Sequence, residues 1–102
     1  MVMNISIKTK NITLNNALEV FVHEKIDSLE KFLGNTNSLL AEVDLSKTTE
    51  HHNKGDVFRA EVQIEVPGKL LRAASTMDDL RKAIVEVKDQ LQIQIKKYRE
   101  TR

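Results

Sequence analysis

The side chains best suited to chemistry in this 102-residue chain are basic ones that recur along its last third. Apolar residues return there every three or four positions from 77 to 102, which predicts one long amphipathic helix. One flank of its apolar stripe carries four basic residues with no Asp or Glu among them, namely Arg81, Lys88, Lys96 and Arg99. Such a row would attract phosphate groups. The plainer alternative is a solvated face whose cations complement the negative end of the helix dipole.

Lys25 is a second candidate, because it falls inside the apolar stripe of a helix expected between residues 15 and 33. A lysine in that position most often extends from the helix edge to water. The sharper alternative is that its ammonium opens between the two helices, where an anion could meet it.

Other chemistries find little support in the sequence. There is no Cys, so disulfides, thiolate metal sites and Cys nucleophiles are excluded. No glycine-rich phosphate loop or nucleophile–base pair is present, so we expect no enzyme, no cofactor and no small-molecule substrate. His51 and His52 are adjacent in a polar loop expected from Thr48 to Gly55, and they have no partner at ligand spacing. We therefore predict no metal site.

Composition limits the partners and the compartment. Charged residues make up 30% of the chain, yet the formal net charge is only +1, so any attraction to nucleic acid must come from segregated charge. No apolar run approaches the roughly twenty residues of a membrane span, and the N-terminus lacks a signal-peptide core. We expect a soluble cytoplasmic protein, with a single domain over residues 1–102 and no membrane partner.

Two periodicities predict the elements that position these side chains. Alternation with period two predicts strands at about residues 2–9, 39–46, 57–66 and 69–75, with a tight turn at Pro67-Gly68. Asn15 or Asn16 is expected to cap the first helix, and Gly34 to end it after Leu33. For the second helix, Thr76 and Asp79 have the spacing of a capping box.

The resulting β-α-β-β-β-α order predicts an α+β fold, a two-layer sandwich with both helices on one face of a four-stranded mixed sheet. The first two strands should be parallel through a right-handed crossover, and the others antiparallel. Seven residues should project from the outer face, none of them aromatic: Glu42, Asp44, Arg59, Glu61, Gln63, Glu65 and Arg72. Sheets that stack RNA bases need exposed aromatics. Any nucleic acid should therefore meet the helix side.

The chain also resembles a known family. The segments MNISIKTKNITLNNALEVFVHEKIDSLEKFL and MDDLRKAIVEVKDQLQIQIKKYRE are similar to those of the short ribosome hibernation-promoting factors, also called ribosome-associated inhibitors or subunit-interface proteins. The family's first-helix pattern is matched by Leu18, Phe21, Val22, Lys25, Leu29, Glu30, Lys31 and Phe32. Its second-helix pattern is matched by Asp79, Ala83, Ile84, Asp89, Leu91, Gln94, Lys97 and Tyr98.

The resemblance implies a stress or stationary-phase factor that binds the small ribosomal subunit. It would contact ribosomal RNA in the channel used by messenger and transfer RNA, and keep idle ribosomes inactive. The family holds RNA through basic residues on both helices, and this role carries over to Lys25, Lys31, Lys96, Lys97 and Arg99. Arg72 is a further candidate on the sheet side.

Four positions depart from the family pattern: Arg81, Val85, Gln90 and Ile93. Two expected phosphate contacts are absent at Gln90 and Ile93, and Arg81 and Lys88 could replace them on the opposite flank. Val85 and Ile93 lie outside the apolar stripe, which leaves a second hypothesis open. A protein-binding module, either self-associating or a modulator of an alternative sigma factor, would use such an apolar patch.

Overall fold

The computed structural model describes residues 3–33, 39–48 and 57–100. Its elements are β1 (Met3–Lys10), α1 (Asn16–Asp27), α2 (Glu30–Leu33), β2 (Leu39–Thr48), β3 (Val57–Val66), β4 (Lys69–Met77) and α3 (Leu80–Glu100). The predicted order is confirmed, except that the first helix is divided. Gly34 and the segment around His51 and His52 lie outside the described residues.

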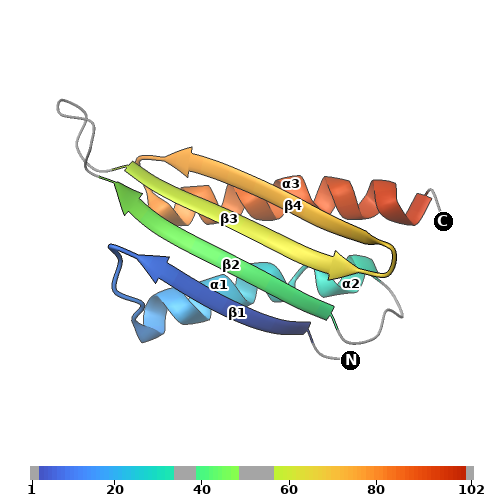
Figure 1. Ribbon diagram of the computed structural model, residues 1–102, viewed down its shortest axis with the longest axis horizontal. Helices are drawn as coiled ribbons and strands as arrows, with labels where there is room; N and C mark the ends of the chain where they lie inside the picture. The colour runs from blue at the N-terminus through green and yellow to red at the C-terminus, as the bar shows by residue number, and fades with distance from the viewer. Residues whose placement is uncertain (1–2, 34–38, 49–56, 101–102) are drawn as a thin grey trace.

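The four strands form one sheet in the order β1-β2-β3-β4, with β1 parallel to β2 and the other pairs antiparallel. The helices cover one face of this sheet, with α1 behind β1 and β2, α2 near the end of β3, and α3 behind β3 and β4 (Figure 1). The predicted two-layer α+β sandwich is therefore confirmed. None of the described helices is long and apolar enough to cross a membrane.

The core lies between the two layers and is built from the residues that the periodicities selected. Inward residues of β3 alternate with outward ones, since Ala60, Val62 and Ile64 are buried whereas Arg59 and Glu65 are exposed. The stripe of α3 buries Ala83, Ile84, Val87, Leu91, Ile95 and Tyr98 against them. Packing of this stripe fixes which flanks of α3 remain available for function.

The first predicted helix is interrupted after Asp27. Asn15 begins it as expected, because its side-chain oxygen accepts a hydrogen bond from the Leu18 N–H at 2.8 Å. At the other end the Ser28 hydroxyl donates to the Lys25 carbonyl at 2.6 Å, and the Leu29 N–H bonds to the carbonyl of Ile26, only three residues back. This tighter turn breaks the ladder and directs Leu29 into the core. The prediction of one continuous helix to Leu33 was wrong.

The start of α3 also differs from the prediction. Thr76 lies in β4, where it pairs with Arg59 of β3, so it cannot form a capping box. Asp79 caps the helix instead, because its carboxylate accepts the N–H groups of Arg81 at 2.8 Å and Lys82 at 3.3 Å. Strand pairing has prevailed over the local capping signal, and β4 continues to Met77 rather than ending at Ser75.

Three side chains of α3 attach one of its flanks to β4 and to the turn that precedes it. The Gln94 amide accepts from the Arg72 N–H at 3.3 Å and donates to the Arg72 carbonyl at 2.8 Å. The Tyr98 hydroxyl donates to the Pro67 carbonyl at 2.7 Å, and the Ser75 hydroxyl donates to the Glu86 carboxylate. With this flank held against the edge strand, the opposite flank of α3 is turned toward α1 and α2.

On the outer face of the sheet, Glu61 forms ion pairs with two arginines. Arg59 donates to its carboxylate at 2.9 Å, and Arg72 donates to the other oxygen of the same group. Hydrogen bonding from Arg59, followed by that from Arg72, holds the pKa of Glu61 below its ordinary value of 4.5, against burial, which raises it. Arg72 is thereby engaged on the face opposite the helices.

A lowered pKa makes this cluster a source of acid sensitivity. The ion pairs stabilise the fold above pH 4.5, and this contribution is lost as the pH falls through the lower folded-state pKa of Glu61. We expect Glu61→Gln to be less stable than wild type at neutral pH, and the difference to shrink on acidification below pH 4.5. Urea unfolding at several pH values measures this difference in the free energy of unfolding. Glu65→Gln, at an exposed position of the same face, is the control. A difference that stays constant with pH would contradict the assignment.

Candidate nucleic-acid interface

Most of the predicted cations gather where α1 and α2 lie beside α3. Lys25 lies on α1 and Lys31 on α2, the two helices beside α3 (Figure 1). Lys25 shares a ring contact with Arg81 of α3, and Lys31 shares one with Lys96. We call this set the basic interhelical face, and it comprises Lys25, Lys31, Arg81, Lys88, Lys96 and Arg99.

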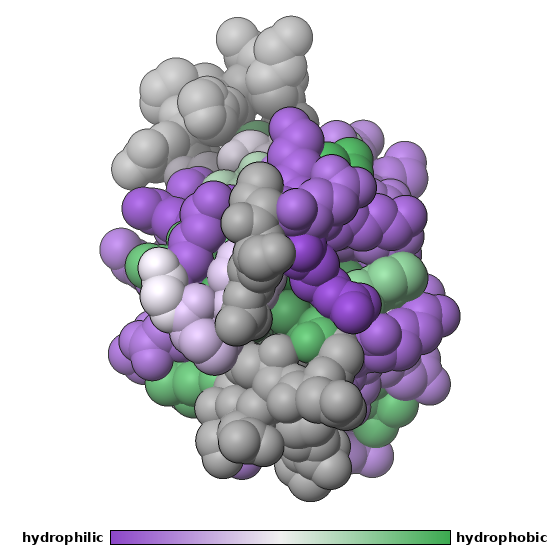
Figure 2. Space-filling view, turned by 90° about the vertical axis from the view of Figure 1, so that its right-hand side faces the viewer, coloured by the Kyte–Doolittle hydropathy of each residue, from purple (hydrophilic) through white to green (hydrophobic). Residues whose placement is uncertain are grey.

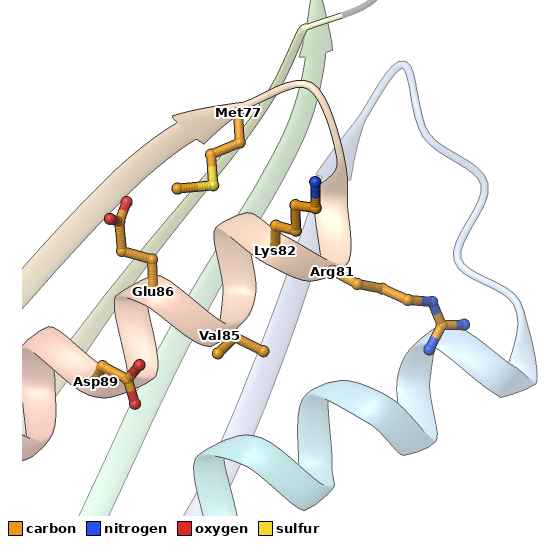
Figure 3. Close-up of a pocket in the computed structure, with 6 residues that line it drawn as sticks. All are labelled: Met77, Arg81, Lys82, Val85, Glu86 and Asp89. Carbon is orange, nitrogen blue, oxygen red and sulfur yellow. The ribbon is translucent and has the colours of Figure 1, made fainter.

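At one end of the basic interhelical face, two cations share the ring of Phe21. The Lys25 Nζ lies 5.4 Å from the ring centroid, and the Arg81 Cζ lies 4.7 Å from it. Arg81 extends from α3 toward α1 (Figure 3). Among the described residues, neither cation forms an ion pair with a carboxylate. Lys25 therefore sits beside a second positive charge from the other helix, an arrangement that favours a bound anion.

At the other end, three cations surround Phe32 of α2. The Nζ atoms of Lys31 and Lys96 lie 5.2 and 5.7 Å from the ring centroid, and Arg99 donates to the Phe32 carbonyl at 3.0 Å. Phe32, Lys96, Arg99 and Glu100 line a hollow of about 350 Å³. Seen from this end, hydrophilic residues crowd the surface and small hydrophobic patches show between them (Figure 2).

Lys88 departs from the predicted arrangement. Its Nζ lies 2.8 Å from a carboxylate oxygen of Asp89, and its side chain is only 22% exposed. Successive residues of a helix are 100° apart, so Asp89 lies at the border of the basic flank and its carboxylate reaches Lys88. The prediction that this flank is free of carboxylates was wrong at this position. Lys88 consequently offers less charge to an external anion than Arg81, Lys96 or Arg99.

Two predicted residues lie apart from the basic interhelical face. Arg72 projects from the outer side of the sheet, where it pairs with Glu61. Lys97 is exposed in the last turn of α3, toward the flank that also carries Lys82. A ligand bound between the helices would not reach Arg72.

A second hollow, of about 450 Å³, opens beside the start of α3. Its lining residues are Met77, Arg81, Lys82, Val85, Glu86 and Asp89 (Figure 3). Glu86 leaves α3 on the side of Met77, away from Arg81 (Figure 3). Two carboxylates offset two cations here, so this hollow offers no net attraction to phosphate. Within the described parts of the chain, no three His, Asp or Glu side chains gather as a metal site.

Sequence reasoning missed the part played by Phe21 and Phe32, which it assigned to the apolar stripe. Both rings are only partly buried and lie beneath the cations of the basic interhelical face. The spacing of Phe21 and Lys25, four residues apart on one helix, could have indicated the first contact. The contacts to Arg81, Lys96 and Arg99 depend on how the helices pack.

Comparison with known proteins gives a family and several relatives. Residues 5–102 match the model of a family described as Sigma 54 modulation protein / S30EA ribosomal protein. The ribosome hibernation promotion factor of Lactococcus lactis subsp. cremoris (strain MG1363) is 31% identical over 96 residues, which cover 92% of this chain and 48% of that protein. The factor of the same name from Staphylococcus aureus (strain COL) is 28% identical over 89 residues, covering 87% of this chain and 44% of that protein. The chain thus spans about half the length of these relatives.

Solved structures agree with the fold. The N-terminal domain of Thermus thermophilus Protein Y is 30% identical with a TM-score of 0.81, and the match covers 94% of this chain and 99% of that domain. A ribosomal subunit interface protein from Coxiella burnetii has a TM-score of 0.77 with 96% and 99% coverage. At 16% identity, the second likeness concerns the fold alone.

Proposed function

Because this chain belongs to the family described as Sigma 54 modulation protein / S30EA ribosomal protein, we propose that it acts on the ribosome as a hibernation factor. In this proposal it binds ribosomal RNA of the small subunit in the channel for messenger and transfer RNA, and keeps idle ribosomes inactive. It works by occupying that space, in the cytoplasm where ribosomes are found, with no catalysis and no cofactor. The single observation that carries the proposal is the basic interhelical face.

The dimensions of this face support a polyanionic ligand. Arg81 and Arg99 lie near opposite ends of α3, and the rise of about 1.5 Å per residue separates them by about 27 Å. A backbone that carries one charge per nucleotide can place several phosphates along such a length. Lys25 and Lys31 extend the same charge across to α1 and α2. The overall net charge of +1 would not attract RNA, but this segregated charge does.

The outer face of the sheet is a poorer candidate for RNA. Its exposed positions include the carboxylates of Glu42, Asp44 and Glu65, and no aromatic side chain projects from the described strands on that side. Phosphates would be repelled there, and bases would find no ring on which to stack. The helix side is therefore the side that we assign to the ribosome.

Sedimentation with purified bacterial small subunits tests the proposal. We expect the protein to travel with the subunits at low salt and to be released as the salt concentration rises. The reason is that dissolved cations then compete with the protein's basic side chains for the RNA phosphates. Protein that stays at the top of the gradient at low salt would contradict the proposed function.

The alternative of a protein-binding module has weaker support. Ile93 is 59% exposed, whereas Val85 is partly buried along the hollow beside Met77. Isolated exposed aliphatic residues are normal on a protein surface. Neither residue favours a protein partner over the ribosome.

Lys25 offers a direct test of one contact. Lys25→Met keeps the length and the apolar stem, so we expect the fold to persist and binding to small subunits to weaken roughly tenfold through loss of one charged hydrogen bond. Lys8→Met, at an exposed position of β1, is the matched control and should bind as wild type does. Unchanged binding by Lys25→Met would mean that Lys25 merely extends to water.

A further inference from the structure

We propose that an unpaired RNA base stacks on Phe32, in the hollow lined by Phe32, Lys96, Arg99 and Glu100. This inference rests on the proposed function and adds to it a subsite that recognises bases rather than phosphates. The ligand is then an RNA loop or another single-stranded RNA segment, because unstacking a base from an RNA double helix costs free energy.

The ring of Phe32 is accessible to polar groups. Two lysine Nζ atoms lie 5.2 and 5.7 Å from its centroid, and both lysine side chains are exposed. An ammonium over a ring is held by the negative charge of the π face. Each nucleobase also has a π face that can stack on an aromatic ring. When a base arrives, the ammonium groups are free to turn from the ring to the phosphates on either side.

Arg99 is hydrogen-bonded to the backbone of Phe32 and lines the same hollow. One of its guanidinium nitrogens donates to the Phe32 carbonyl at 3.0 Å, which links the end of α3 to α2. A guanidinium has five N–H donors, so the others remain to bind phosphate oxygens. This hydrogen bond holds one cation near the ring before RNA binds, which lowers the entropy cost of binding.

Glu100 makes the hollow electrostatically asymmetric, because it places a negative charge beside two positive ones. Its carboxylate repels phosphate but accepts hydrogen bonds from the amino and imino N–H groups of a base. Lys96 and Arg99 attract phosphate in the same hollow. The nucleotide is thereby oriented, with its phosphate toward the two cations and its base edge toward Glu100.

The size of the hollow agrees with one nucleotide. Ligand pockets range from about 300 to about 1,000 Å³, and the volume here, about 350 Å³, lies at the lower end. The larger hollow beside Met77 has no aromatic lining residue and two carboxylates that offset its cations. Phe32 therefore marks the better site for a stacked base.

The test compares two ligands of equal charge. One is a single-stranded RNA of about ten nucleotides, and the other is a ribose-phosphate chain of the same length without bases. We expect the wild-type protein to bind the RNA roughly 5- to 150-fold more tightly, which is the range of one base–aromatic stack. Both ligands should show the same salt dependence, since they carry the same phosphates.

Phe32→Leu retains an apolar side chain and removes the ring, so it should bind the two ligands with nearly equal affinity. Phe58→Leu is the matched control, because Phe58 is also partly buried under a lysine, Lys47, but lies on β3. It should keep the wild-type preference for RNA.

Equal affinity of the wild type for both ligands, or absence of binding to either, would overturn the subsite, and this comparison needs no variant to fold. A folded Phe32→Leu that keeps the full preference would overturn it as well. Failure of the proposed function would be recognised in a different experiment, because the protein would then not sediment with small subunits.

Discussion

Arg81→Gln/Lys96→Gln should bind small ribosomal subunits at least tenfold more weakly than wild type, and with a flatter dependence on salt. The two cations lie near opposite ends of the basic interhelical face, one over Phe21 and the other over Phe32. Each lost phosphate contact should reduce the slope of log affinity against log salt by roughly 0.7–0.9. Binding titrations at four or five salt concentrations measure both effects. Arg81 is preferable to Lys88 for this test because Asp89 already pairs with Lys88.

A matched double variant distinguishes the effect of where the two charges lie from the effect of changing the net charge. Lys69→Gln/Lys82→Gln removes the same two charges from exposed positions outside the basic interhelical face. We expect its affinity and salt slope to stay close to those of the wild type. Circular dichroism must first show all variants folded, because Lys96 also complements the dipole of α3. If the control were as damaging as Arg81→Gln/Lys96→Gln, binding would depend on total charge and the assigned face would be wrong.

The largest effect on stability is expected from Leu91→Ala. Leu91 is completely buried in the middle of α3, between the helix and the sheet. Its removal loses apolar burial and leaves a cavity, which together cost about 2–5 kcal/mol. The total stability of a domain is typically about 5–15 kcal/mol, so the variant should be close to unfolding under mild denaturant. Urea unfolding monitored by circular dichroism measures the change.

Ile93→Ala is the control for Leu91→Ala. It lies two residues further along the same helix, but its side chain is 59% exposed. We expect its stability to lie within about 0.5 kcal/mol of the wild type. Equal costs for the two substitutions would contradict the assignment of the buried stripe of α3.

The strands and the layer order could be predicted because one face of the sheet is buried. In β3 the alternation of buried Ala60, Val62 and Ile64 with outward residues fixes both the strand and its orientation. The two departures have physical causes beyond periodicity. Thr76 is taken into β4 by its pairing with Arg59, and the Ser28 hydroxyl competes for the carbonyl of Lys25 at the end of α1.

The cations of the candidate site could be identified from helical spacing alone, but their surroundings could not. The contact of Arg81 with Phe21 joins residues of different helices, so it requires knowledge of the packing between α1 and α3. The pairing of Lys88 with Asp89 depends on side-chain conformations that no periodicity specifies. The hollow at Phe32 likewise exists only because α2 meets the end of α3.

Competition on the small subunit tests the central claim most directly. Subunits are first loaded with messenger RNA and initiator transfer RNA, and the binding of the protein is then compared with its binding to empty subunits. Because the protein is proposed to occupy the same channel, we predict that it binds empty subunits and is excluded from loaded ones. Equal binding to both, with the messenger and transfer RNA still in place, would contradict the proposed mode of action.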